Sequence, residues 1–111
     1  MRLRIDTSTI KFRIGGVARP RMESRANQVQ KITPDGRPVW TVRLFAIDTQ
    51  AGTTEQLWVE VAGEQPQLVV DEVATVQGLV YAPWVNNKQE IVRAFRADSI
   101  NIDGAARRTA A

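Results

Sequence analysis

Alternating apolar and polar positions along the chain predict five β-strands and no long helix. The five segments cover residues 9–18, 39–48, 55–62, 74–85 and 90–102. Each is rich in Val, Ile, Thr and aromatic residues and is bounded by Gly, Pro, Asn or Asp. A turn at residues 50–53 joins the second and third strands, and a turn at 86–88 joins the fourth and fifth, so the pattern predicts two hairpins. Gly15-Gly16 predicts a bend in the first strand.

The connecting segments complete a predicted fold class. Residues 19–37 are polar, lack a helical period and end in a Pro-Asp-Gly turn signal, which predicts a long mobile loop. Residues 63–72 are the place for one short helix between the third and fourth strands. The chain is therefore predicted to be all-β, a five-stranded OB-fold-like barrel over residues 1–103 with a flexible tail at 104–111. An open sheet with a covering loop is the alternative.

Strand periodicity assigns the residues to two faces of the sheet. The predicted core side holds Trp40, Val42, Leu44 and Ala46, then Leu57, Val59 and Val61, then Ala74, Val76, Gly78, Val80 and Ala82. The opposite face combines aromatic rings with guanidinium groups, namely Arg43, Phe45, Trp58 and Tyr81, together with Arg93 and Phe95. Bases stack on such rings at about 1–3 kcal/mol each, while arginine follows phosphates or stacks as well.

The tryptophans and arginines of this face also have structural interpretations. Trp58 and Trp84, the latter just before the 86–88 turn, could each cap an open end of the barrel. Arg43 and Arg93 could form weak cross-strand pairs with Glu60 or Glu90. Taken together with the basic charge, the rings favour a stacking surface.

Charge is distributed unevenly. Residues 1–37 carry nine basic and three acidic side chains, whereas the remainder carries six basic and nine acidic ones. Clustered Lys and Arg favour a polyanion partner, although a solvated, solubilising surface explains the same count. The candidate phosphate contacts in this half are Lys11, Arg13, Arg19, Arg21, Arg25, Lys31 and Arg37.

The absence of cysteine and histidine narrows the chemistry. It excludes disulfides, thiolate metal sites and histidine-dependent catalysis. A carboxylate-only enzyme built from Asp48, Glu55, Glu60 and Asp71 ranks well below a binding protein, because their spacing forms no metal cluster. We therefore predict a protein that is not an enzyme, with no catalytic residue, metal or cofactor. Without a signal-like or membrane-length apolar run, we expect a soluble cytoplasmic protein.

Three segments resemble the bacterial single-stranded DNA-binding proteins in order and spacing. They are GRPVWTVRLFAID, TEQLWVEVAGEQPQLV and VATVQGLVYAPWVNNKQEIVRAF. The counterparts of the family pattern are residues 42–46, Trp58 after Thr54-Glu55, residues 76–79 and Trp84. The resemblance covers about residues 9–102. It implies an OB-fold that binds single-stranded DNA with little sequence preference, as a homo-oligomer.

The chain also departs from that family. The family's acidic tip, which recruits replication enzymes, has no counterpart in the basic sequence GAARRTAA, and residues 19–37 are unusually rich in arginine. We therefore expect a compact variant, either an accessory factor of a plasmid or mobile element or a primosome-type protein. RNA is an alternative ligand. A protein-interaction adaptor that uses the same aromatic face is the alternative function.

Overall fold

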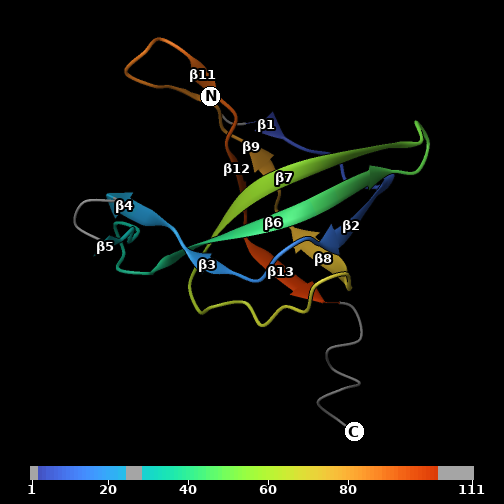
Figure 1. Ribbon diagram of the computed structural model, residues 1–111, viewed down its shortest axis with the longest axis horizontal. Coiled ribbons are helices and arrows are strands. Elements are labelled where there is room, and N and C mark those ends of the chain that lie inside the picture. The colour runs from blue at the N-terminus through green and yellow to red at the C-terminus, as the bar shows by residue number, and fades with distance from the viewer. Residues whose placement is uncertain (1–2, 25–28, 103–111) are drawn as a thin grey trace, which may run out of the picture.

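The computed structural model describes residues 3–24 and 29–102, and these residues form an all-β fold without a helix (Figure 1). Arg25 and the predicted tail at 104–111 lie outside the described residues. The strands are β1 (Leu3–Arg4), β2 (Ile10–Ile14), β3 (Arg19–Pro20), β4 (Met22–Ser24), β5 (Val29–Gln30), β6 (Val39–Asp48), β7 (Thr53–Ala62), β8 (Val73–Gln77), β9 (Val80–Tyr81), β10 (Trp84–Val85), β11 (Ile91–Val92), β12 (Phe95–Ala97) and β13 (Ser99–Ile102).

The first predicted hairpin is confirmed as the long pair β6 and β7. It pairs without a register shift from Val39 opposite Ala62 to Asp48 opposite Thr53. The Asp48 carboxylate accepts backbone N–H groups of the following turn, and Gly52 there adopts a φ of 71°. This positive φ favours glycine, so the turn chemistry sets the register of the whole pair.

The second predicted hairpin is also present, but it is divided into three short pairs. Trp84 lies opposite Val92, Tyr81 opposite Phe95 and Ser99 opposite Gln77. Gly78 interrupts the ladder with a φ of 68°, and the alternation of faces shifts by one residue there. Leu79 is consequently buried at 3% exposure, while Val80 is only half-buried. The predicted assignment of Gly78, Val80 and Ala82 to the core side is therefore wrong.

The strands form an open path and not the predicted closed barrel. The hydrogen-bonded order is β1-β9-β12-β7-β6-β2-β8-β13, with β3 also on β6. The predicted helix is absent as well, since the described residues 63–72 contain no helix. Gly63 has a φ of 116° and Pro66 follows, both unfavourable in a helix, and Leu68 anchors the segment in the core. The prediction is confirmed in its all-β class alone.

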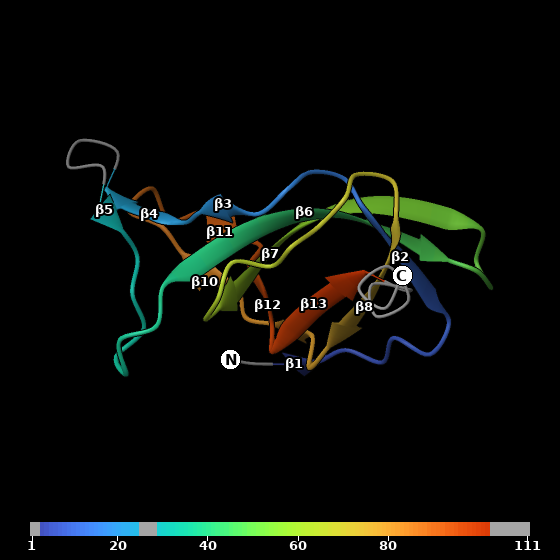
Figure 2. The ribbon, with the colours of Figure 1, turned by 90° about the horizontal axis from the view of Figure 1, so that it is seen from below.

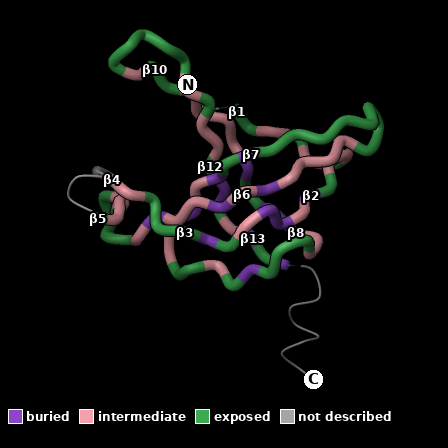
Figure 3. The backbone as a smooth tube through the Cα atoms, in the orientation of Figure 1, coloured by how far each residue is buried: buried purple, intermediate pink, exposed green. Residues whose placement is uncertain are grey.

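The core lies beneath the β6–β7 pair, which arches over β8, β12 and β13 in Figure 2. Buried positions concentrate at the crossing of these strands in Figure 3, and the projecting hairpins are exposed. The side chains of Ile14, Val42, Leu44 and Val59 are almost wholly inaccessible. Burying one such side chain stabilises the fold by about 1.5–3 kcal/mol. Trp40 packs against this core, as predicted, and its indole N–H donates to the Gly63 carbonyl at 2.9 Å.

In the segment 19–37, predicted as a long loop, the described residues 19–24 and 29–37 contain three short strands. The first predicted strand corresponds to β2, which pairs with β6. The chain then bends at Gly15-Gly16 and pairs with β6 again as β3. Strands β4 and β5 then form a separate hairpin that projects from the sheet (Figure 1). The Pro-Asp-Gly turn is confirmed, with Gly36 at a φ of 89°. Among the described residues, no helix is long and apolar enough to cross a membrane.

Candidate nucleic-acid interface

Arg43 and Trp58 form the centre of a surface on the outer side of the β6–β7 pair. The two residues are register partners, and the Arg43 guanidinium carbon lies 6.0 Å from the Trp58 ring centroid. Trp58 is 52% exposed, which is unusual for a large ring. The arrangement presents an accessible indole beside a cation, a combination suited to stacking with a base.

The Gly15 backbone holds Arg43 in this position. Nε and Nη2 of Arg43 donate to the Gly15 carbonyl oxygen at 3.1 and 2.5 Å. A Cβ at Gly15 would lie 3.1 Å from a Phe45 ring carbon and 3.2 Å from Arg43 Nε. The absent side chain therefore lets Arg43 and Phe45 pack directly against the bend. Arg43 thus contacts Gly15 and Trp58, and the alternative of a cross-strand pair with Glu60 does not form among the described residues.

Three further predicted basic residues lie on the same outer side. Arg13 is opposite Phe45, Lys11 is opposite Ile47 and Arg19 is opposite Thr41. Arg13 is fastened by a 2.8 Å hydrogen bond from Nη1 to the Asp71 carbonyl, whereas Lys11 and Arg19 are exposed. The face therefore has hydrogen-bonded and exposed cations beside Trp58, and a positively charged surface with an aromatic ring suits binding along a nucleic-acid backbone. We call Arg13, Arg19, Arg43, Phe45 and Trp58 the β6–β7 face.

Among the described residues, the other predicted loop cations, Arg21, Lys31 and Arg37, have intramolecular acidic partners. Arg21 and Lys31 both approach the Glu60 carboxylate. Arg37 is tied to Asp35 by a 3.0 Å hydrogen bond within its own turn. The Thr33 hydroxyl also donates to Asp35, and this hydrogen bond lowers the pKa of the Asp35 carboxyl. Arg37 is therefore part of a self-contained turn.

Tyr81, Phe95 and Arg93 do not belong to the β6–β7 face. The Tyr81 and Phe95 rings lie 5.1 Å apart, and Phe95 packs against the core. Arg93 lies over Phe95 at 5.6 Å and pairs with Glu55 at 3.9 Å, not with Glu90. With Leu3 and Ile5 these three residues line a second, shallow cavity. The single aromatic face predicted from parity is therefore divided, because the left-handed Gly78 moves Tyr81 to the core side.

Trp84 occupies a third location, on the β10–β11 hairpin. This hairpin projects from the same side of the molecule as the β4–β5 hairpin, opposite the tip of the β6–β7 pair (Figure 1). Trp84 is 49% exposed, and Val85 and Ile91 are more exposed still. Trp84 is therefore not buried as a cap of the core in this chain.

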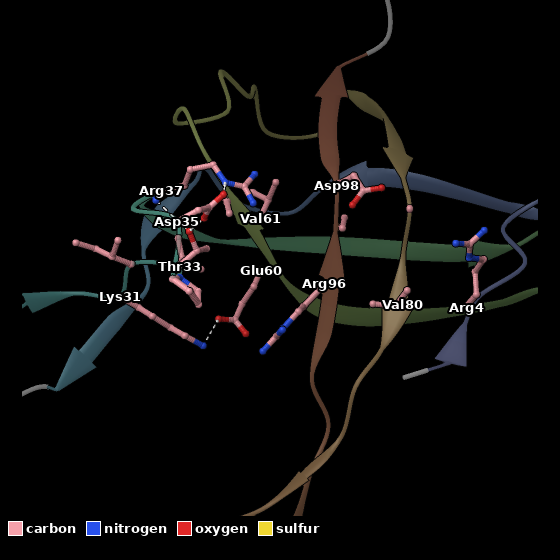
Figure 4. A pocket seen from close by; sticks show the side chains of 16 residues that line it. Arg4, Lys31, Thr33, Asp35, Arg37, Glu60, Val61, Val80, Arg96 and Asp98 are labelled. Atoms are coloured by element: carbon pink, nitrogen blue, oxygen red, sulfur yellow. Dashed lines mark hydrogen bonds and ion pairs between the residues drawn. The ribbon is translucent and has the colours of Figure 1, made fainter. Parts of the chain in front are cut away.

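A cleft of about 720 Å³ lies at the end of β7 (Figure 4). Its walls come from residues 31–39, the end of β7, and β12, and they include Arg96, Glu60 and Asp98. Arg96 was not predicted as a site residue. It reaches the cleft because β12 pairs in parallel with β7 and sets Arg96 opposite Glu60. The spacing of residues in the sequence does not predict that β7 and β12, which are far apart in the chain, pair in parallel.

No protein-family model, curated protein or solved structure matches the chain. The functional argument therefore rests on the chemistry of the residues themselves. Within the described part of the chain, no group of acidic residues could hold a metal ion. The candidate interface is thus a surface of rings and cations around Trp58, and a cleft lies at the end of β7.

Proposed function

We propose that the protein binds single-stranded nucleic acid, DNA in the first instance, with little sequence preference. A base stacks on Trp58, and Arg43, Arg13 and Arg19 contact the flanking phosphates. The observation that carries this proposal is the exposed Trp58 ring beside an arginine that the Gly15 carbonyl holds in place. Stacking tolerates any base because every base has a π-face. The cations bind the phosphate backbone, which is the same for every base sequence.

The strand connectivity supports the same proposal. The described strands can be grouped by the five predicted strands to which they belong. The first (β2) pairs with the second (β6), and the second pairs with the third (β7). The third pairs in parallel with the fifth (β12), which pairs with the fourth (β9). The fourth also pairs with the first through β8 and β2. We propose that this open sheet follows the strand order of an OB-fold, in which the second and third strands and the neighbouring loops bind oligonucleotides. Homo-oligomerisation stays a prediction of the family resemblance, and a role with a mobile element stays a prediction drawn from the departure from that family.

The test is a titration of intrinsic tryptophan fluorescence with oligo-dT at about 50 mM and about 200 mM salt. We expect quenching that is lost in Trp58→Phe, and weaker quenching as salt rises. Because Trp40 is half-buried and hydrogen-bonded, it supplies a constant background signal. Trp58→Ala should weaken binding by about 5- to 160-fold, the equivalent of about 1–3 kcal/mol of stacking. Gln56→Ala, an exposed change on the same strand face, is the matched control. Unchanged affinity in Trp58→Ala would contradict the proposal.

The β10–β11 hairpin favours a second candidate, the protein-interaction adaptor. Val85 and Ile91 are 60% and 73% exposed, on the opposite face of the hairpin from Trp84. Exposed apolar side chains on both faces suit contact with a protein partner. This candidate predicts no oligonucleotide quenching and a stable complex that Ile91→Ser disrupts, whereas the nucleic-acid proposal predicts unchanged oligo-dT affinity in Ile91→Ser.

A further inference from the structure

The Glu60 carboxylate lies among basic side chains from three separate segments. Arg21 Nε is 3.6 Å and Lys31 Nζ is 3.5 Å from the same oxygen, Glu60 Oε1. Arg96 on β12 is the register partner of Glu60, and its side chain extends towards the carboxylate in Figure 4. We call these four residues the Glu60 cluster. It contains three cations around one carboxylate, an arrangement with excess positive charge.

The pairing within the cluster is loose. Strong charge-assisted N–H···O bonds are about 2.7–2.9 Å long, shorter than either contact of Glu60 Oε1. This oxygen is buried and accepts no hydrogen bond from the described residues. The Glu60 side chain is 17% exposed, whereas those of Arg21 and Lys31 are 44% and 38% exposed. An acceptor arriving from solvent can therefore reach both cations without passing Glu60.

Lys31, Glu60 and Arg96 of the cluster line the 720 Å³ cleft, and Arg21 approaches Glu60 from outside this lining. The size of the cleft falls within the roughly 300–1,000 Å³ range of ligand sites. A phosphodiester carries the same charge as a carboxylate but is free to move into hydrogen-bonding distance. The backbone of Glu60 is fixed on β7 opposite Thr41 on β6, and from there its carboxylate lies 3.5 and 3.6 Å from the two cations. A phosphate group therefore matches Arg21, Lys31 and Arg96 better than the resident carboxylate does.

We propose that the Glu60 cluster is a phosphodiester subsite in which Glu60 competes with the bound strand for the cations. This inference rests on the proposed function and adds that Glu60 lowers the affinity of the protein for the bound strand. On binding, Arg21 and Lys31 turn from Glu60 to a backbone phosphate, and Arg96 contacts the same phosphate. Removing the Glu60 charge therefore tightens binding, although the substitution deletes an ion-pair partner.

The experiment compares the full-length wild type with Glu60→Gln by anisotropy of labelled oligo-dT over a range of salt concentrations. We expect about two- to fivefold tighter binding at low salt and a salt dependence steeper by about one unit. The matched control is Glu55→Gln, which removes the same charge and also an arginine pair, but away from the cleft. Its dissociation constant should equal that of the wild type. If Glu60→Gln binds no tighter than Glu55→Gln, the inference is wrong.

A second pair of variants keeps the test valid if Glu60→Gln folds poorly. Arg96→Gln should weaken binding about two- to fivefold, because the subsite loses a cation. Arg93→Gln, which lies on the opposite side over Phe95, should not. Equal effects of the two substitutions would overturn the subsite. Wild-type binding with no gain in Glu60→Gln refutes this inference alone, whereas no binding by any variant refutes the proposed function as well.

Discussion

Gly15→Ala is the most direct perturbation of the β6–β7 face. An alanine Cβ there would lie 3.1 Å from Phe45 Cε2, 3.2 Å from Arg43 Nε and 3.3 Å from Arg43 Cγ. These distances are shorter than ordinary van der Waals contact, so the Arg43 side chain has to move. Its two hydrogen bonds to the Gly15 carbonyl would lengthen or break as it does so.

Two opposing effects determine how much Gly15→Ala changes the free energy of unfolding. Alanine restricts the unfolded chain, which stabilises the folded state by about 0.4–1 kcal/mol. Overpacking costs about 1–3 kcal/mol, and losing a hydrogen bond from a charged donor costs about 1.5–3 kcal/mol. Since the neighbours relax in part, we expect a net loss of about 1–3 kcal/mol in the free energy of unfolding.

Urea denaturation measures this loss, with Gly16→Ala as the matched control. A Cβ at Gly16 would lie 3.7 Å from Arg43 Nε, an ordinary contact, so the entropic gain should dominate there. Gly15→Ala should also weaken oligo-dT binding, because Arg43 leaves its position beside Trp58. If the two alanine variants have equal unfolding midpoints, the backbone bend does not hold Arg43 as described.

Two further predictions concern turns outside this face. Gly78→Ala combines a left-handed φ with overlap between the new Cβ and the Asp98 carboxylate, so it should lower the free energy of unfolding by about 2–4 kcal/mol. Gly36→Ala, with a similar φ and nothing nearby, should cost less in the same urea titration, and an equal cost would refute the role of Asp98. Asp35 has a pKa below its ordinary 3.8 because Thr33 donates to it, so its stabilisation is present above that value and is lost as pH falls through the folded pKa. The difference in melting temperature between wild type and Asp35→Asn should therefore shrink as pH falls from about 5 to about 2, and a constant difference would contradict this.

The long hairpin could be predicted because its signals are local. Residues 39–48 were predicted with the bounds that β6 has, and residues 55–62 all lie within β7. Strand period and a Gly-containing turn determine such a pair without help from the rest of the fold. The outward position of Arg43, Phe45 and Trp58 followed from the same parity.

The assignment of side chains to faces by strand alternation was wrong beyond one residue that adopts a left-handed conformation. Gly78 has a φ of 68°, and beyond it Leu79 and Tyr81 turn to the core side, opposite to their predicted face. Glycine adopts this conformation without strain, but it does not have to, so the residue type alone does not reveal the shift. The predicted helix at 63–72 was wrong because Gly63 and Pro66 oppose it.

The amino-acid sequence by itself determined the all-β class, the two hairpins, the outward Trp58 and the exclusion of thiol and histidine chemistry. These follow from side-chain period, turn residues and composition, all of which act over a few neighbouring positions. Tertiary structure alone decided that Tyr81 leaves the β6–β7 face, that Gly15 holds Arg43, and that Arg96 meets Glu60. Each of these depends on backbone conformation or on pairing between strands far apart in sequence, where loop closure and packing of the whole chain set the outcome.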